Sequence, residues 1–349
     1  MAISLTLKEN TKSLPLCISF RVLLGLYLII PLCLLLYGLD QLFWQGWLQD
    51  NLPTRPTHFL LFQLLFGTPH ILASTLLLVS NKAYVAVYKH RLAKMTFMMA
   101  VIFGVGSLFI PYRAFYIAVA GITVYHVLKQ QYGVARGCCQ LPNVAYYWLL
   151  FLSIAAGLQI YLGIFLQASL DAETTYQLKN GASIVTIVLF LSALYCQRFI
   201  EKKNTLGRYF FWANIFLVIS SFYLYDQGYY FFAILIPRLV HDATAYIFYV
   251  THDYNKHRLQ PQNALYRMGS RYSIPIWVVL PILSFFMAFV LQAYGDMMIE
   301  WITLNLFDVA LHQVITLGLL GYLALMHYYT EALTWRANSP YRPYISFTK

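Results

Sequence analysis

Long hydrophobic stretches separated by short polar connections recur along the whole chain. About ten of them approach the roughly 20 residues that an α-helix needs to cross a bilayer, with limits near 14–37, 59–79, 94–111, 114–134, 145–167, 182–200, 209–225, 229–251, 273–294 and 301–333. Because the stretches are continuous rather than alternating, they favour helices over a β-barrel. The pattern predicts an all-α, polytopic integral membrane bundle of about ten transmembrane helices, in one domain covering residues 1–349.

The composition agrees with a membrane protein. Hydrophobic residues make up 60% of the chain and charged residues only 11%, whereas soluble domains carry about a quarter charged residues. The first stretch has no small-residue cleavage site behind it, so it is interpreted as a retained span rather than a signal peptide. The five cysteines form no C-x-x-C pair and no zinc spacing, which indicates reduced thiols rather than a disulfide framework.

The charges predict an orientation. Nineteen of the 24 lysines and arginines fall in one set of alternate segments, and the opposite loops hold only Arg55, Arg113 and Lys179. By the positive-inside rule, both termini are expected to be cytoplasmic. The net charge of +11 then reflects topology rather than nucleic-acid binding. The expected partners are the lipid bilayer of a bacterial-type inner membrane or its equivalent, and its anionic lipids on the cytoplasmic face.

Histidines fall at matched depth in helices that run the same way. In the second, fourth and eighth stretches, His70, His126 and His241 lie about 11 or 12 residues from the outer end, or roughly 17 Å down at 1.5 Å per residue. The tenth stretch is too long for one perpendicular span, so its fourth histidine is an open choice between His312 and His327. Ionisable groups at such depth are costly and usually functional.

Spacing along the helices adds candidate partners. His126 with Gln130, His327 with Glu331 and Asp308 with His312 are each separated by four residues, which places both members on one helix face. The Glu331 spacing makes His327 the better fourth ligand. His252 lies three turns from His241, too far to share one ion on a straight helix, and is expected in a separate cytoplasmic-side layer with Gln130, His327 and Glu331.

Each of these residues also has a structural interpretation. A single histidine within a membrane often only bonds a neighbouring helix. Arg238 and Asp242, four residues apart, can neutralise one another as a structural ion pair, or Asp242 can orient His241 from behind. Asp253 and His257, beside Lys256, are expected to be solvated at the cytoplasmic edge.

Several imidazoles with a nearby carboxylate suit iron, copper or zinc. A site in hydrocarbon beside an aromatic-rich interior suits an apolar small-molecule substrate. The leading hypothesis is a metal-dependent membrane oxidoreductase or oxygenase, with non-haem iron held by His70, His126, His241 and His327. Glu331 or Asp242 would then act in catalysis by orienting a ligand or moving protons. Tyr125, Tyr246 and Tyr328 are candidate substrate-side groups by adjacency.

Three segments carry a resemblance to a known family. They are Phe66-Gly67-Thr68-Pro69-His70, then Tyr125-His126 followed by Gln130 and Gly133, and the run from Arg238 to Asp242. With the polytopic pattern, the chain resembles the Brp/Blh-type membrane carotenoid dioxygenases. That resemblance implies an iron-dependent dioxygenase that cleaves β-carotene to retinal.

Two other classes of function use the same residues. Two histidines at one depth on facing helices could ligate a b-type haem. Alternatively, the histidines with Arg238 and Asp242 could form the polar pathway of a proton-coupled transporter. The sequence shows no internal repeat of the kind common in transporters.

Overall fold

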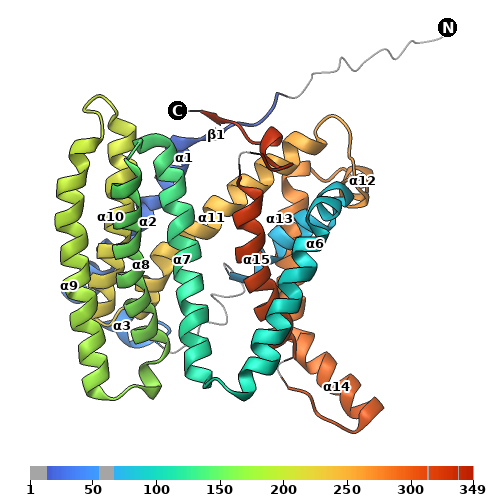
Figure 1. Cartoon of the computed structure of the whole chain (residues 1–349), viewed down its shortest axis with the longest axis horizontal. Coiled ribbons are helices and arrows are strands. Elements are labelled where there is room, and N and C mark those ends of the chain that lie inside the picture. The colour runs from blue at the N-terminus through green and yellow to red at the C-terminus, as the bar shows by residue number, and fades with distance from the viewer. Residues whose placement is uncertain (1–13, 55–66, 313, 337, 349) are drawn as a thin grey trace.

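The computed structural model describes residues 14–54, 67–312, 314–336 and 338–348. Its first group of helices occupies the left side of Figure 1. The group consists of α1 (Phe20–Gly25) with a 3₁₀ turn at Leu26–Leu28, α2 (Ile29–Phe43), α3 (Trp47–Asn51), α7 (Tyr112–Cys139), α8 (Asn143–Phe165), α9 (Ala172–Cys196) with a 3₁₀ turn at Gln197–Phe199, and α10 (Thr205–Asp226). A further 3₁₀ turn, Gln167–Ser169, joins α8 to α9.

The second group lies on the right of the same view (Figure 1). It consists of α5 (Thr68–Val79), α6 (Lys82–Met99) with a π-helical extension at Ala100–Val105 and a 3₁₀ turn at Gly106–Leu108, α12 (Ala264–Arg271), α13 (Ile276–Val290) with a π-helical segment at Leu291–Gly295, α14 (Asp296–Phe307), and α15 (Leu320–Thr334) preceded by a π-helical segment at Val314–Leu319. Helix α14 projects from the lower end of this group.

Helix α11 (Tyr230–His257) crosses obliquely between the two groups (Figure 1). The buried hydrophobic residues form one large cluster around α7 to α10 and a smaller one around α5, α13 and α15. Val240 and Phe248 of α11 belong to the first cluster, and Ala245 and Tyr249 belong to the second. A side chain on α11 can therefore reach both groups, which places any site on this helix at their junction.

Polar side chains cap the first turns of two helices. Asp171 accepts a hydrogen bond from the Thr174 amide (2.6 Å) at the start of α9, and Asn204 accepts one from the Gly207 amide (2.9 Å) at the start of α10. These side chains satisfy amides that would otherwise have no helical partner. Because its carboxylate accepts from Thr174, the pKa of Asp171 is lowered.

The two described ends of the chain meet. Strand β1 (Ile18–Ser19) pairs in parallel with β2 (Phe347–Thr348), next to a 3₁₀ turn at Arg342–Tyr344. The Phe20 ring stacks on that of Phe347, with ring centroids 5.1 Å apart. Both described ends thus lie at one end of the molecule, as Figure 1 shows.

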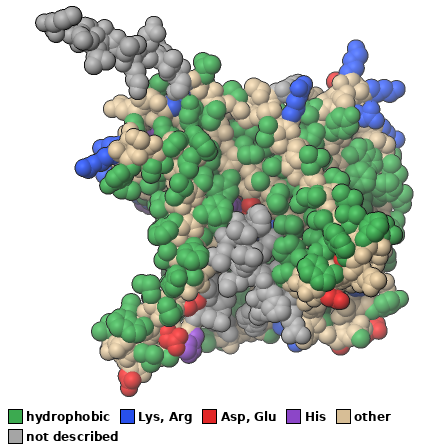
Figure 2. Space-filling view, turned by 180° about the vertical axis from the view of Figure 1, so that it is seen from behind, with side chains coloured by type: hydrophobic (Ala, Val, Ile, Leu, Met, Phe, Trp, Pro, Cys, Tyr) green, Lys and Arg blue, Asp and Glu red, His purple; other side chains and the backbone are tan. Residues whose placement is uncertain are grey.

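One face of the molecule is largely apolar. Figure 2 shows hydrophobic side chains over most of one face, with Lys and Arg towards the upper edge and most Asp and Glu towards the lower end. Among the described residues, five helical stretches are long and apolar enough to cross a membrane: Phe20–Phe43, Asn143–Phe165, Ala172–Phe199, Tyr230–His257 and Ile276–Phe307. A sixth results if the bent pair Thr68–Val79 and Lys82–Val105 counts as one span.

The expectation of about ten spans is therefore not supported. Helices α5 and α6 meet at 107°, so two of the expected spans form one bent unit. Helices α7 and α10 are long, but α7 carries Arg113, Lys129 and Arg136, and α10 carries Arg208, Asn214 and Asp226. Part of the expected second span, residues 59–66, lies outside the described residues.

The expected tenth span is broken in the structure. Helix α14 ends at Phe307, and Asp308 adopts a left-handed conformation with φ 55°. Helix α15 begins only at Leu320. A left-handed conformation cannot continue a right-handed α-helix, so Asp308 ends α14.

Candidate metal centre

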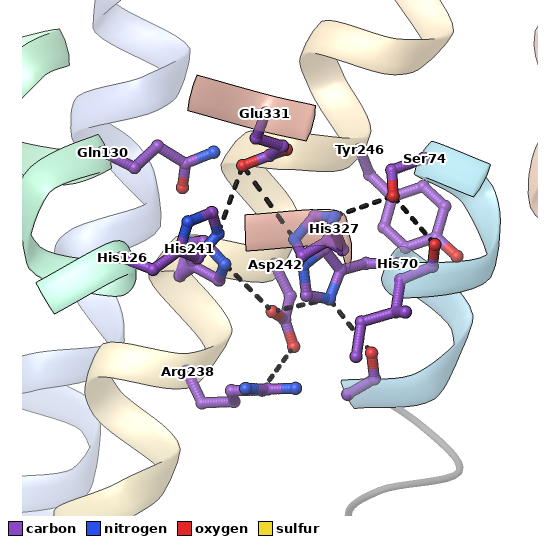
Figure 3. Close-up of polar contacts among 12 residues, drawn as sticks. His70, Ser74, His126, Gln130, Arg238, His241, Asp242, Tyr246, His327 and Glu331 are labelled. Atoms are coloured by element: carbon purple, nitrogen blue, oxygen red, sulfur yellow. Dashed lines mark hydrogen bonds and ion pairs between the residues drawn. The ribbon is translucent and has the colours of Figure 1, made fainter. Parts of the chain in front are cut away.

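Four buried histidines from four helices converge at the junction of the two groups (Figure 3). They are His70 of α5, His126 of α7, His241 of α11 and His327 of α15. Ring centroids are 4.5 Å apart for His70 and His327, 4.9 Å for His126 and His241, 5.0 Å for His126 and His327, and 5.1 Å for His70 and His241. Imidazoles in different helices thus surround one small volume.

The donor atoms form two overlapping sets. The ligand atoms of His70, His241 and His327 lie within 4.8 Å of one another, as do those of His126, His327 and Glu331. His327 belongs to both sets, so it sits at the centre of the cluster. Buried histidine and carboxylate groups at this spacing could hold a metal ion.

The tautomer of His70 follows from its surroundings. Its Nδ1 atom lies 3.0 Å from the Gly67 carbonyl oxygen and 3.1 Å from Oδ1 of Asp242. Both neighbours are acceptors, so Nδ1 carries the proton and donates to the carbonyl. The Nε2 atom of His70 therefore presents a bare lone pair, as a metal-ligating histidine does.

The tautomer of His327 is fixed in the same way. Ser74 Oγ donates to the Ile71 carbonyl oxygen at 2.8 Å and lies 2.7 Å from Nδ1 of His327. We assign the hydroxyl proton to the bond with the Ile71 carbonyl, so that Ser74 accepts from Nδ1–H of His327. The Nε2 atom of His327 then also presents a bare lone pair.

These two bare nitrogens face one another at 2.9 Å. With a proton on one nitrogen this contact is an N–H···N hydrogen bond, and with a proton on neither the two lone pairs repel unless a cation lies against both. Two nitrogen ligands, each about 2.1 Å from one ion, are about 3.0 Å apart at a right angle and about 3.4 Å apart at the tetrahedral angle. The separation of the two Nε2 atoms therefore fits adjacent ligands of a single metal ion.

Other donor atoms around this point have no hydrogen-bond partner among the described residues. They are Nε2 of His126, both ring nitrogens of His241, Oδ1 of Asp242 and Oε2 of Glu331. Nε2 of His126 approaches Oε2 of Glu331 to 3.2 Å, but without hydrogen-bond geometry. A buried polar atom without a partner is costly, and a shared cation would satisfy Nε2 of His126, one ring nitrogen of His241 and Oε2 of Glu331 together.

Asp242 makes one of the two contacts that the sequence left as alternatives, the ion pair with Arg238. Its Oδ2 accepts from Arg238 Nε at 3.1 Å, which is the i,i+4 ion pair. Its Oδ1 lies closer to His70 (3.1 Å) than to His241 (3.9 Å). Asp242 therefore contacts the Nδ1 side of His70, which comes from another helix, more closely than it contacts the adjacent His241.

Glu331 lies between the cluster and an adjoining cavity. Its Oε1 accepts a hydrogen bond from the Tyr249 hydroxyl, and its Oε2 lies 3.9 Å from Nε2 of His327. The cavity has a volume of about 980 Å³, and His126, Gln130 and Glu331 form part of its wall. A small molecule in this cavity would therefore contact residues of the cluster.

The candidate tyrosines fall into different places. Tyr328 lines the cavity and packs on His126, with ring centroids 4.5 Å apart. Tyr125 also lines the cavity, and its hydroxyl accepts from Lys129 at 2.5 Å. Tyr246 instead bonds Ser284 of α13 at 2.8 Å and does not line this cavity, so its substrate-side position stays a prediction.

Two other predicted members lie apart from the cluster. His312 is an exposed residue that faces Glu300 (3.3 Å), and its expected pairing with Asp308 is lost where the helix ends. His252 bonds Tyr84 and Asp253, not the layer with His327 and Glu331 that was expected. Gln130 bonds Gln131 at 3.3 Å and lines the cavity beside His126.

Asp253 and His257 are buried, so the expectation that they are solvated is also wrong. The Tyr266 hydroxyl donates to Oδ2 of Asp253, and the Gln262 amide donates to Nδ1 of His257 at 3.1 Å. The loop after α11 and helix α12 fold back over these residues. Hydropathy alone did not reveal this cover.

Ser74 and Tyr249 orient the cluster and were missed in the sequence. Ser74 is four residues after His70, so its helical spacing could have indicated it. Tyr249 is eight residues after His241 on α11, and nothing in the sequence distinguishes it from the other 28 tyrosines.

Comparison of the chain with models of protein families, with curated proteins and with solved structures finds no match. The interpretation of the site therefore depends on its own geometry.

Proposed function

We propose that this protein is a membrane-embedded, metal-dependent oxygenase or oxidoreductase that acts on an apolar lipid or isoprenoid substrate. The observation that carries the proposal is the convergence of buried imidazoles with Glu331, in which Nε2 of His70 lies 2.9 Å from Nε2 of His327 and each of these rings has a partner at Nδ1. Such orientation by a second layer of groups is a regular feature of metal-ligating histidines.

Non-haem iron is the metal we propose. Neutral imidazoles with one carboxylate also suit copper and zinc, but the resemblance of three segments to the Brp/Blh-type dioxygenases favours iron. When bound, iron would supply oxygen activation. The large cavity beside Glu331 and the apolar helices around it favour a substrate that enters from the bilayer.

The residues of the chain have separable roles in this proposal. His70, His126, His241 and His327 would hold the metal, while Gly67 and Ser74 keep two of the rings in one tautomer. Arg238 balances the charge of Asp242 inside the bundle. Glu331 touches both the cluster and the cavity, so it is the group placed to take or deliver a proton there.

The same geometry disfavours haem. A haem iron takes its axial ligands from opposite faces of the macrocycle, so a porphyrin must fit between the two rings. The neighbouring rings of this cluster have centroids only 4.5–5.1 Å apart and meet edge to face. That separation leaves no slot for a macrocycle. A proton-coupled transporter has no specific observation in its favour here.

We also propose a multi-pass orientation with both chain termini on the cytoplasmic side. The parallel pairing of β1 with β2 supports it, since the described ends lie together. The lysines and arginines at that end would face anionic headgroups.

Elemental analysis of the detergent-purified full-length chain tests the proposal. We expect iron bound to the wild type and lost in His241→Ala and His126→Ala. His252→Ala is the matched control, because His252 lies on the same helix as His241 and is equally buried but has protein partners on both ring nitrogens.

Retention of metal by both cluster variants would overturn the metal site. A Soret band in the wild type would show bound haem, and the assignment of non-haem iron would then be wrong. Metal binding without oxygen consumption on any apolar substrate would keep the site and remove the oxygenase assignment.

A further inference from the structure

The cavity beside the metal centre is apolar along most of its length and basic at one end. Its wall includes Ile122 and Leu325 near His126, and Phe248 and Trp335 near Phe347 of β2. Arg336 and Arg342 belong to the same wall, beside Phe347. The cavity thus connects the cluster to two cationic side chains.

These cations have no acidic partner. Among the described residues, no Asp or Glu oxygen lies within 4.0 Å of a side-chain nitrogen of Arg336, Arg342 or Lys129. Glu331 is the single carboxylate in the described wall, and its Oε1 already accepts from Tyr249. The cavity wall therefore carries three cations without an acidic partner in the described chain: Arg336 and Arg342 at one end, and Lys129 on α7 beside Gln130.

The two arginines are held at the same end by the backbone. The Ser339 amide donates to the Arg336 carbonyl oxygen (3.0 Å), and the Arg342 amide donates to the Ser339 carbonyl oxygen (3.1 Å). Arg342 also lies over the Phe347 ring, 5.2 Å from its centroid. The last contact places the Arg342 guanidinium beside an aromatic residue of the cavity wall, and Arg336 lines the same wall.

We propose that this cavity binds a long-chain carboxylate, with its carboxylate on Arg336 and Arg342 and its chain directed towards His126 and Glu331. Guanidinium groups bind carboxylates through paired, charge-assisted hydrogen bonds, and the apolar wall suits a hydrocarbon chain. That this ligand is the substrate rests on the proposed function; that it binds here does not.

Two glycines leave space in the cavity for the hydrocarbon chain of the ligand. Gly133 and Gly137 face the cavity one turn apart on α7, and a Cβ on Gly133 would meet no atom within 4 Å. A larger side chain at Gly133 would therefore project into the cavity without displacing the protein. Gly121 on the same helix is equally uncrowded but does not line the cavity, which makes it the matched control.

The test measures binding of tritiated oleate and oleyl alcohol to the full-length protein in a neutral detergent, at alkaline pH where the carboxyl group is ionised. The two probes share one chain and differ in charge. We expect oleate to bind about tenfold more tightly than oleyl alcohol, as one charge-assisted contact gives. The double variant R336Q/R342Q should bring this ratio near one, whereas Arg271→Gln, exposed and outside the cavity, should leave it unchanged.

Gly133→Leu should weaken both probes and Gly121→Leu neither. A wild-type ratio near one, or a ratio that the double arginine variant does not lower, would overturn the proposal. Metal content measured on the same samples separates the two ideas. Bound metal with no preference for oleate refutes only the ligand class, and preference for oleate without bound metal refutes only the metal function.

Discussion

Helix α11 carries the dipeptide His-Asp twice, and the two copies have opposite surroundings. Around His252 and Asp253, Tyr84 bonds Nε2 of the histidine at 2.8 Å, Asp253 bonds its Nδ1 at 2.9 Å, and Tyr266 bonds the other carboxylate oxygen. Burial and Asp253 raise the pKa of Tyr266, so it remains a donor. Every polar atom of these two side chains has a protein partner.

Three turns earlier, His241 has no hydrogen-bond partner on either ring nitrogen. Asp242 serves Arg238 and His70 instead. Both histidines are buried to the same degree, so burial does not distinguish a ligand from a structural residue. The difference is whether the protein itself completes the hydrogen bonds, and only the His241 copy leaves donor atoms for something else.

The largest expected difference is between removing a histidine of the metal cluster and removing His252, the buried histidine with protein partners. His327→Ala deletes the ligand shared by both donor sets, so bound metal should fall to background. His252→Ala should keep the metal and lower the free energy of unfolding by about 1–3 kcal/mol, because Tyr84 and Asp253 lose a buried partner. Metal analysis and thermal unfolding of both variants measure this contrast, which would fail if His252→Ala also lost its metal.

Substitution of Asp242 and of Asp253 should change metal affinity differently, but by a smaller factor than loss of a ligand. Asp242→Asn weakens the group behind His70, and loss of such a partner costs about 10–100-fold in metal affinity. Asp253→Asn should leave metal affinity unchanged. Titration against a competing chelator measures both, and equal affinities for the two variants would contradict a metal-orienting role for Asp242.

Metal removal should affect stability through the cluster alone. A ligand present at 100 to 1,000 times its dissociation constant stabilises the native state by about 3–4 kcal/mol, so a chelator should lower the melting temperature of the wild type. The same treatment should not change His327→Ala. A chelator-induced shift in that variant would mean that the metal binds elsewhere.

The smallest effect is expected at His312. Its side chain is 67% exposed and faces Glu300 outside the bundle. His312→Ala should leave metal content unchanged and alter stability by no more than about 0.5 kcal/mol. Loss of metal in this variant would restore His312 as a ligand.

Counting residues along apolar stretches was enough to group three histidines that the structure brings together. It works because a helix has a fixed rise per residue, so His70, His126 and His241 could be compared without knowing how the helices pack. The Glu331 spacing also favoured His327 over His312 for a physical reason, since four residues span one turn.

The rest depended on contacts between distant segments. Asp242 reaches His70 across 172 positions, and Tyr249 reaches Glu331 across 82. The number of spans was overestimated because apolar content does not reveal the bend between α5 and α6 or the break after Phe307. The cover over Asp253 likewise comes from Tyr266, in a helix of its own.

The position of α15 also has a consequence for biosynthesis. The candidate histidine ligands are spread from residue 70 to residue 327, so ribosomal synthesis supplies the shared histidine last of the four. Until α15 is made and docks against α5, the His70 Nε2 atom lacks its opposite nitrogen. Metal acquisition as we propose it is therefore a post-translational event, and a nascent chain stalled before α15 would reach the membrane without its metal.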